Sequence, residues 1–208
     1  MIAAIHQPNY LPALSFFQKM RSCDIFILLD NAQFTRNSFI NRNRIQTPNG
    51  PLWLTVPVQN NGRFGQRIRD VEIDNSQDWE RKHWGSITQN YQKTKGFTPH
   101  AAPLEAIYST KWTKLLELNL TLISYIRSNL GISPRLRVAS ELAVNGQNTQ
   151  RLIDLCKKVG ADTYLSGSGG RNYQDEQLFK ESGIKLTFQE GKFSNLSAID
   201  DLLNGVPI

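Results

Sequence analysis

A cluster of polar side chains in the stretch IHQPNYLP, near the start of the sequence, is suited to binding an anion. The stretch follows a short apolar run and precedes a segment whose apolar side chains recur at helical spacing. His6 and Asn9 are therefore expected at a helix N-terminus, where unpaired amides favour negative charge. We interpret both as catalytic, stabilising charge on a transferring phosphate, with Gln7 and Tyr10 as substrate-binding residues. The alternative is that His6 only holds a turn through a hydrogen bond to backbone.

A second cluster, SGSGGRNY at residues 166–173, combines glycines with hydroxyl groups. Glycine permits close approach of backbone to a ligand, and the serine hydroxyls can donate to phosphate oxygens. The pattern is neither a Walker loop nor a dinucleotide fingerprint, because no Gly-Lys-Ser or Gly-Lys-Thr follows and Asn172 replaces the third glycine. The predicted phosphate-binding residues are Ser166, Gly167, Ser168, Gly169 and Gly170, and Tyr173 is a predicted substrate contact. The alternative is a solvated Gly/Ser turn.

Asp30 ends the apolar run DIFILLD, which has the composition of a strand buried on both faces. Its carboxylate is expected at the ligand edge of the sheet, where it could orient a nucleophile or hold Mg²⁺. We interpret it as a third catalytic residue. A turn cap is the alternative for this side chain.

Polar residues on a predicted strand near residue 42 also fall into two faces. The period of two places Arg42 and Arg44 on one face and Asn41 and Asn43 on the other. The arginines suit bidentate binding of phosphate or carboxylate, and the alternative is a charged face that protects a sheet edge. The predicted substrate-binding residues of this region are Gln33, Asn41, Arg42, Asn43 and Arg44.

Alternating strand and helix patterns at both ends of the chain must position these clusters. Asn49 and Gly50 join two β-rich runs, which predicts an antiparallel hairpin, and residues 68–74 are a possible third strand beside it. Helical patterns fill the middle of the chain. The expected fold is a layered α/β domain spanning residues 1–208, with a mainly parallel Rossmann-like sheet, an inserted antiparallel β-hairpin and a helical middle segment. Ligands of such sheets bind beyond the carboxyl ends of strands, so the first two clusters are expected to be neighbours.

The net charge and composition of the chain limit the classes of binding partner that are expected. The 208 residues carry a formal net charge of +6, which favours an anionic small molecule such as a nucleotide or sugar nucleotide. The basic residues are scattered, so no nucleic acid is expected, and neither a signal peptide nor an apolar span long enough for membrane insertion is recognised. A cytoplasmic location is expected. Cys23 and Cys156 lie in apolar runs, so no metal site or disulfide is expected.

Three stretches together resemble the WbqC-like protein family over nearly the whole chain: IHQPNYLP, the segment from LLDNAQF to WLTVPV, and YLSGSGGRNYQ. One departure is Ala13, where a large aromatic residue is common in this family. The resemblance implies a role in O-antigen or other surface-polysaccharide biosynthesis. The first stretch is also similar to nucleotidylyltransferases with a His-x-Gly-His signature, although Pro8 replaces the glycine and Asn9 the second histidine.

The hypothesis is a transferase that acts on a sugar nucleotide or glycan precursor with nucleotidylyltransferase-like activation. The alternative is a non-catalytic nucleotide-sugar-binding or assembly protein of the same pathway. The cofactor stays open, with a nucleoside triphosphate and Mg²⁺ as the candidate. The sequence identifies neither the donor and acceptor nor the oligomeric state.

Overall fold

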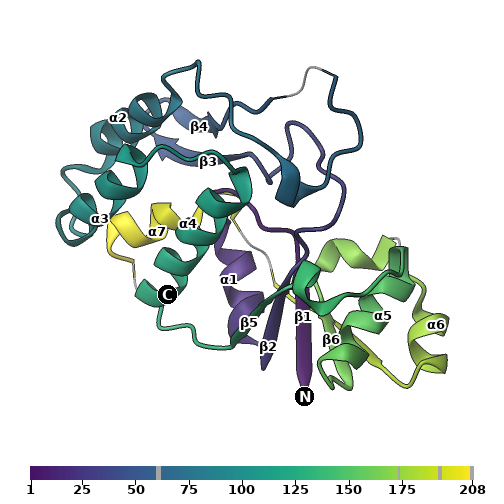
Figure 1. The fold of residues 1–208 in the computed structure, drawn as a ribbon. Helices are drawn as coiled ribbons and strands as arrows, with labels where there is room; N and C mark the ends of the chain where they lie inside the picture. Colours follow the sequence, from purple (N-terminus) through teal and green to yellow (C-terminus); the bar gives the residue numbers. More distant parts are fainter. Residues whose placement is uncertain (60–61, 173, 192–193, 207–208) are drawn as a thin grey trace. The chain divides into compact units, whose positions relative to one another are not determined.

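The computed structural model describes residues 1–59, 62–172, 174–191 and 194–206 (Figure 1). Its chain divides into two compact units built of interleaved segments. Unit 1 contains Met1–Gln7, Ser15–Asn31 and Ile132–Phe193, and unit 2 contains Pro8–Leu14, Ala32–Gly131 and Ser194–Ile208. The expectation of a single domain over residues 1–208 stays a prediction. Among the described residues, no helix has both the length and the apolar character that a membrane crossing requires.

Unit 1 is built on a sheet of five parallel strands. The strands lie in the order β5 (Arg135–Val138), β2 (Ile25–Leu28), β1 (Ile2–His6), β6 (Thr163–Ser166) and β7 (Lys185–Phe188). The sheet therefore grows outward from β1, first to one side and then to the other. Such an order is Rossmann-like, and β1 and β6 are the pair at which it reverses.

Helices cover both faces of this sheet. They are α1 (Leu14–Arg21) on one face, and α5 (Asn148–Lys158) and α6 (Glu176–Glu181) on the other (Figure 1). Ile5 and Ile27 pack into one buried cluster with Cys156 of α5 and Phe179 of α6, because alternate strand residues point to the same face. On the opposite face, Phe16 of α1 meets Phe26 of β2 edge-on, with ring centroids 5.0 Å apart. The layered, mainly parallel fold is thus confirmed.

Unit 2 contains the predicted hairpin and the helical middle segment. Its elements are β3 (Arg42–Thr47), β4 (Gly50–Thr55), the 3₁₀ turn η1 (Ile68–Asp70), α2 (Trp79–Tyr91), α3 (Phe97–Ser109), α4 (Leu115–Asn129) and α7 (Ala198–Asn204). Gly50 has a φ of +103°, which a glycine adopts without steric cost, so the Asn-Gly signal fits the turn. β3 and β4 pair in the antiparallel sense. The hairpin prediction is therefore confirmed.

One sequence interpretation in unit 2 is corrected, and one helix was missed. Residues 68–74 do not form a strand, because η1 begins this segment and only isolated bridges follow at Glu72 and Ile73. The apolar residues of this segment are buried by tertiary contacts rather than by pairing in a β-sheet. α7 was not predicted at all, although Ser197 caps it by accepting a hydrogen bond from Ile199 N at 3.2 Å.

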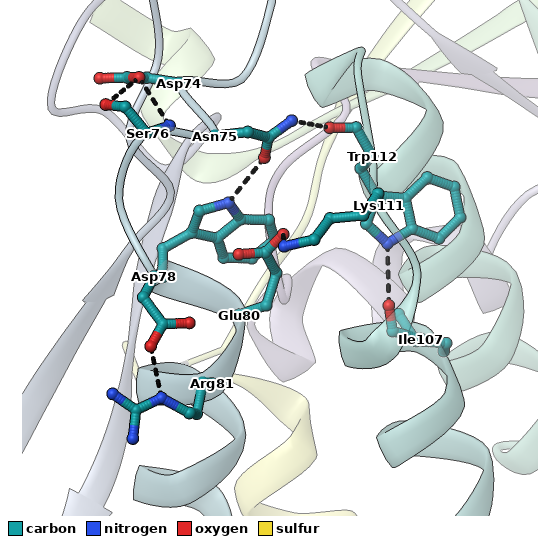
Figure 2. A network of polar contacts seen from close by, with 10 residues as sticks. Asp74, Asn75, Ser76, Asp78, Glu80, Arg81, Ile107, Lys111 and Trp112 are labelled. Carbon is teal, nitrogen blue, oxygen red and sulfur yellow. Dashed lines mark hydrogen bonds and ion pairs between the residues drawn. The ribbon is translucent and has the colours of Figure 1, made fainter.

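A polar network fixes the entry to α2 in unit 2 (Figure 2). Asn75 Nδ2 donates to the Trp112 carbonyl at 2.9 Å, and Lys111 Nζ pairs with Glu80 at 3.1 Å. The helix begins after Asp78. The network thereby joins the start of α2 to the segment that precedes α4.

Candidate functional site

A cavity of about 700 Å³ lies within unit 1 at the carboxyl edge of the parallel sheet. It is lined by Ile5, His6, Gln7, Lys19, Leu29, Asn148, Thr149, Arg151, Leu152, Tyr164, Ser166, Gly167, Gly169, Gly170 and Gln174. The ends of β1 and β6 both contribute, which is where ligands bind in a sheet of this topology. None of these lining residues is acidic, whereas Lys19 and Arg151 are basic. The lining therefore favours an anion.

The loop after β6 can approach the cavity closely only because residue 170 is a glycine. A Cβ at Gly170 would lie 2.1 Å from Ser166 Oγ and 2.8 Å from Gln174 Nε2. These two side chains are themselves hydrogen-bonded, with Gln174 Nε2 donating to Ser166 Oγ at 2.9 Å. A Cβ at Gly169 would meet nothing within 4 Å. Packing thus requires a glycine at residue 170, whereas a side chain at residue 169 would extend into open space.

The N-terminus of α5 forms another part of the lining. Asn148, Thr149 and Arg151 come from its first turn, and the residue before the helix makes no capping hydrogen bond through its side chain. Unpaired amides and the helix dipole favour negative charge at such a position. Arg151 Nε donates to the Gly146 carbonyl at 2.8 Å, which anchors the guanidinium beside the helix start. Helix and side chain thus contribute positive potential together.

Lys19 of α1 is a buried amine in this cavity, and sequence reasoning missed it. Lys19 is only 3% exposed, and its Nζ donates a hydrogen bond to the Ile5 carbonyl at 3.0 Å. Burial lowers the pKa of Lys19 to about 7, because desolvation disfavours the ammonium form. A recognisable signal was present: Lys19 lies three residues after Phe16 and next to Met20, inside the apolar stripe of the helix.

His6 ends β1 as a neutral imidazole. Its Nδ1 donates to the Gln7 carbonyl at 2.9 Å, so Nε2 is left as an acceptor. The pKa of His6 is lowered to about 3, chiefly by burial and also by the charge of Lys19, while the Gln7 hydrogen bond partly opposes both. The ring therefore lines the cavity and also makes the backbone bond that the alternative interpretation expected.

Asp30 lies in unit 1 but is not among the lining residues. Its Oδ1 accepts from Ser140 N at 2.9 Å, in the 3₁₀ turn η2 (Ala139–Leu142) that follows β5. This geometry is that of a turn cap, the alternative for this residue. A catalytic role for Asp30 stays a prediction, and Asp30 is not among the residues that line the cavity.

The polar loop after β1 is divided between the two units after Gln7. Asn9 is half-buried, and Tyr10 is fully buried in unit 2, with its hydroxyl 2.8 Å from His83 Nδ1 and 2.7 Å from the Tyr108 hydroxyl. Burial lowers the pKa of His83 to about 4, so this hydrogen-bond chain is uncharged near neutral pH. Tyr10 thus anchors the loop in a core.

The hairpin residues also belong to unit 2, and the two predicted faces of β3 differ as expected. Asn41 and Asn43 are buried and donate to the carbonyls of Val56 at 3.0 Å and Leu11 at 2.6 Å. Both have structural partners. Arg42 and Arg44 are half-exposed.

Gln33 and Ser168 fall outside the cavity lining. Gln33 is exposed and forms an isolated backbone bridge with Arg67, Ser168 is exposed, and Tyr173 lies outside the described residues. The cavity brings together six predicted residues: His6, Gln7, Ser166, Gly167, Gly169 and Gly170. In the part of the chain that the structure describes, no cluster of three or more His, Cys, Asp or Glu residues could hold a metal ion.

A parallel sheet covered by helices on both faces, with a cation-lined cavity where its strand order reverses, defines a Rossmann-like α/β protein. Residues 7–204 match the model of the WbqC-like protein family, and the chain belongs to that family. It is also 40% identical over 186 residues to the "Uncharacterized protein Rv1507c" of Mycobacterium tuberculosis (strain ATCC 25618 / H37Rv), a match covering 89% of this chain and 80% of that protein. The family resemblance is confirmed, and the relative's name states no activity.

Proposed function

We propose that the protein is a transferase of surface-polysaccharide biosynthesis, of the O-antigen type, that holds the phosphates of a sugar nucleotide in the unit 1 cavity. The observation that carries this proposal is the combination of Lys19, Arg151 and the α5 N-terminus around a cavity whose lining has no carboxylate. A buried amine needs a counter-ion to hold its charge. The ligand's phosphate would supply it.

The dimensions of the cavity suit such a ligand. Its volume of about 700 Å³ falls in the range of roughly 300–1,000 Å³ that small-molecule sites occupy. Leu29, Leu152 and Tyr164 would offer apolar surface to a base or sugar ring, while Lys19, Arg151 and the glycine amides would bind the phosphates. This division between an apolar and a charged part matches a nucleotide better than it matches inorganic phosphate.

In the transfer step, the protonated Lys19 and the Arg151 guanidinium would stabilise the negative charge that develops on the leaving phosphate. His6 Nε2 would accept a hydrogen bond from the acceptor group, since Nδ1 is already committed to Gln7. The lining offers no carboxylate for Mg²⁺. If a nucleoside triphosphate is the cofactor, its Mg²⁺ would be held by the phosphates.

A binding protein without turnover is the second candidate, and one observation favours it. The pKa of His6 is lowered to about 3, the cavity lining has no acidic residue, and Lys19, whose pKa is about 7, is assigned to holding the phosphate, so no further group is left to act as a general base near neutral pH. Such a protein would hold the sugar nucleotide and release it unchanged.

Calorimetric titration with a panel of sugar nucleotides and Mg²⁺–ATP tests the proposal. Arg151→Gln should weaken binding at least tenfold, whereas Lys157→Gln, which removes an equal charge at the exposed far end of the same helix, should stay within twofold. Mass spectrometry of the ligand after incubation with a glycan precursor separates the two candidates, because binding alone leaves masses unchanged. Equal affinities of the two variants would contradict the site.

A further inference from the structure

Unit 2 has a cationic surface on its hairpin that the proposed function does not use. We call it the hairpin arginine face, made of Phe39, Arg42, Arg44 and Trp53. Arg44 lies directly opposite Trp53 in the antiparallel register, so Arg42, Arg44 and Trp53 share one side of the hairpin. The guanidinium carbons of Arg42 and Arg44 lie 4.3 and 5.0 Å from the Trp53 ring centroid. Both cations are therefore stacked on one indole.

Neither guanidinium has an acidic partner among the described residues. Arg42 and Arg44 form no ion pair and no side-chain hydrogen bond there, and the Nε atom of each is buried without a partner. Both side chains are half-exposed, so their terminal nitrogens reach solvent. A guanidinium cannot release its proton to relieve the repulsion between neighbouring charges. An anion bound across the pair would relieve it.

Protection of a sheet edge does not explain these arginines. The carbonyl of Arg44, on the outer edge of β3, accepts a hydrogen bond from Ser197 N at 2.8 Å, so the segment before α7 already covers this position. The aromatic side chains remain open instead: Trp53 is 40% exposed and Phe39 42% exposed, with ring centroids 6.0 Å apart. Exposed rings beside uncompensated cations are features of a binding surface.

A small cavity adjoins the open end of the hairpin. It has a volume of about 270 Å³, and its lining includes Arg36, Asn41, Thr55 and Gln77. Thr55 is the register partner of Arg42, so the cavity and the face meet at this residue pair. The lining contains one arginine, Arg36, in addition to the two arginines of the face, and it has no acidic residue. Polar groups of a ligand would therefore find hydrogen-bond partners next to the arginines.

We propose that the hairpin arginine face is a binding site for a small organic anion. Its phosphate or carboxylate would be held by the guanidiniums of Arg42 and Arg44, and its ring would lie against Trp53 and Phe39. Guanidinium forks match the oxygens of both anions, and the aromatic rings give a preference for ligands with a flat or apolar part. This site is independent of the cavity in unit 1 and does not rest on the function proposed for it.

Phenyl phosphate is the probe for this site, and the side-chain Nε–H resonances of Arg42 and Arg44, assigned from Arg→Gln spectra, are the local readout. Phenyl phosphate should shift both resonances with saturation, inorganic phosphate should do so about tenfold more weakly, and phenol should not. Arg42→Gln or Arg44→Gln should each weaken the remaining response at least tenfold. Arg81→Gln, which removes an exposed arginine paired with Asp78 in the same unit, should stay within twofold.

Two outcomes would overturn the proposal. The first is the absence of saturable shifts, or an equal loss in Arg81→Gln. The second is a single-stranded oligonucleotide that binds through Arg42 and Arg44 at least tenfold more tightly than phenyl phosphate, which would assign the face to nucleic acid. Arg151→Gln should leave the phenyl phosphate shifts unchanged, so failure of the unit 1 function and failure of this site are distinguishable.

Discussion

Unit 1 and unit 2 each contain basic side chains without acidic partners, but the two regions accommodate the charge in opposite ways. In unit 1 the amine of Lys19 is buried, and its pKa is lowered to about 7. In unit 2 the guanidiniums of Arg42 and Arg44 are half-exposed and stacked on Trp53. An amine can give up its proton when it is buried, whereas a guanidinium must stay solvated or stacked.

Because of this difference, two anion sites of similar net charge should respond differently to their surroundings. In the cavity, the charge of the site depends on pH and on the ligand, because protonation of Lys19 and anion binding favour each other. On the hairpin arginine face, the charge is fixed and exposed to salt.

Replacing Lys19 with Met should have the largest effect. The variant retains an unbranched side chain but removes the buried cation, so anion affinity in the cavity should fall about a hundredfold, since loss of one partner of a buried charge pair costs roughly 2–5 kcal/mol. The pKa of His6 should rise, because the Lys19 charge lowers it. Calorimetry and histidine NMR titration measure the two effects, with Lys157→Met as the control. Unchanged affinity would mean that the cavity does not use the amine.

Gly170→Ala should impair the unit 1 cavity and leave the hairpin arginine face unchanged. Because the added Cβ would lie 2.1 Å from Ser166 Oγ, we expect overpacking to cost about 1–3 kcal/mol of unfolding free energy and to weaken ligand binding in unit 1. Gly169→Ala is the matched control, since its Cβ meets nothing within 4 Å. Urea unfolding measures the first effect. Equal behaviour of the two variants would show that the loop after β6 relaxes freely.

The pH dependence should separate the two sites. A lowered amine pKa means that the free protein binds fewer protons than the ligand-bound protein, so binding takes up a proton and weakens as pH rises. For one proton with a free pKa of about 7, affinity in the cavity should fall about fivefold from pH 7 to pH 8. Phenyl phosphate on the hairpin should vary less than twofold between pH 7 and 8. Parallel pH profiles at the two sites would contradict the contrast.

Salt should produce the smallest difference, in the opposite direction. Raising the ionic strength from about 0.05 to 0.3 M should weaken phenyl phosphate binding on the exposed face a few-fold, because the Debye length shortens to the scale of the site. Binding in the cavity, where the Lys19 amine is buried, should change by less than twofold at fixed pH. Titrations at both salt concentrations measure this, and a steeper salt dependence in the cavity would indicate that its charges are solvated.

The sequence predicted elements whose signals are local. The strand patterns around Ile5 and Ile27 reflect burial between helices, and the Asn-Gly turn fixes the hairpin. It did not predict α7 or the 3₁₀ turn at Ile68, because tertiary packing rather than periodicity decides those segments.

The candidate site was predictable to the same limited extent. That His6 and Gly167 line one cavity follows from the rule that parallel strands end at the same edge. The position of Lys19 in the apolar stripe of its helix was a signal for burial, but a helical lysine ordinarily indicates a solvated face, and its partner, the carbonyl of Ile5, is set by the tertiary structure. Likewise, the place of Tyr10 depends on residues 73 and 98 positions away.

The position of β1 at the centre of the sheet has a consequence for folding during synthesis. β1 acquires β2 as a neighbour early, but its other edge pairs with β6, in which Thr163 lies opposite Ile2. At about 5–20 residues per second, a ribosome needs on the order of ten seconds to supply that strand. Until then an apolar strand edge is unpaired, and we expect the nascent chain to depend on chaperones over this interval.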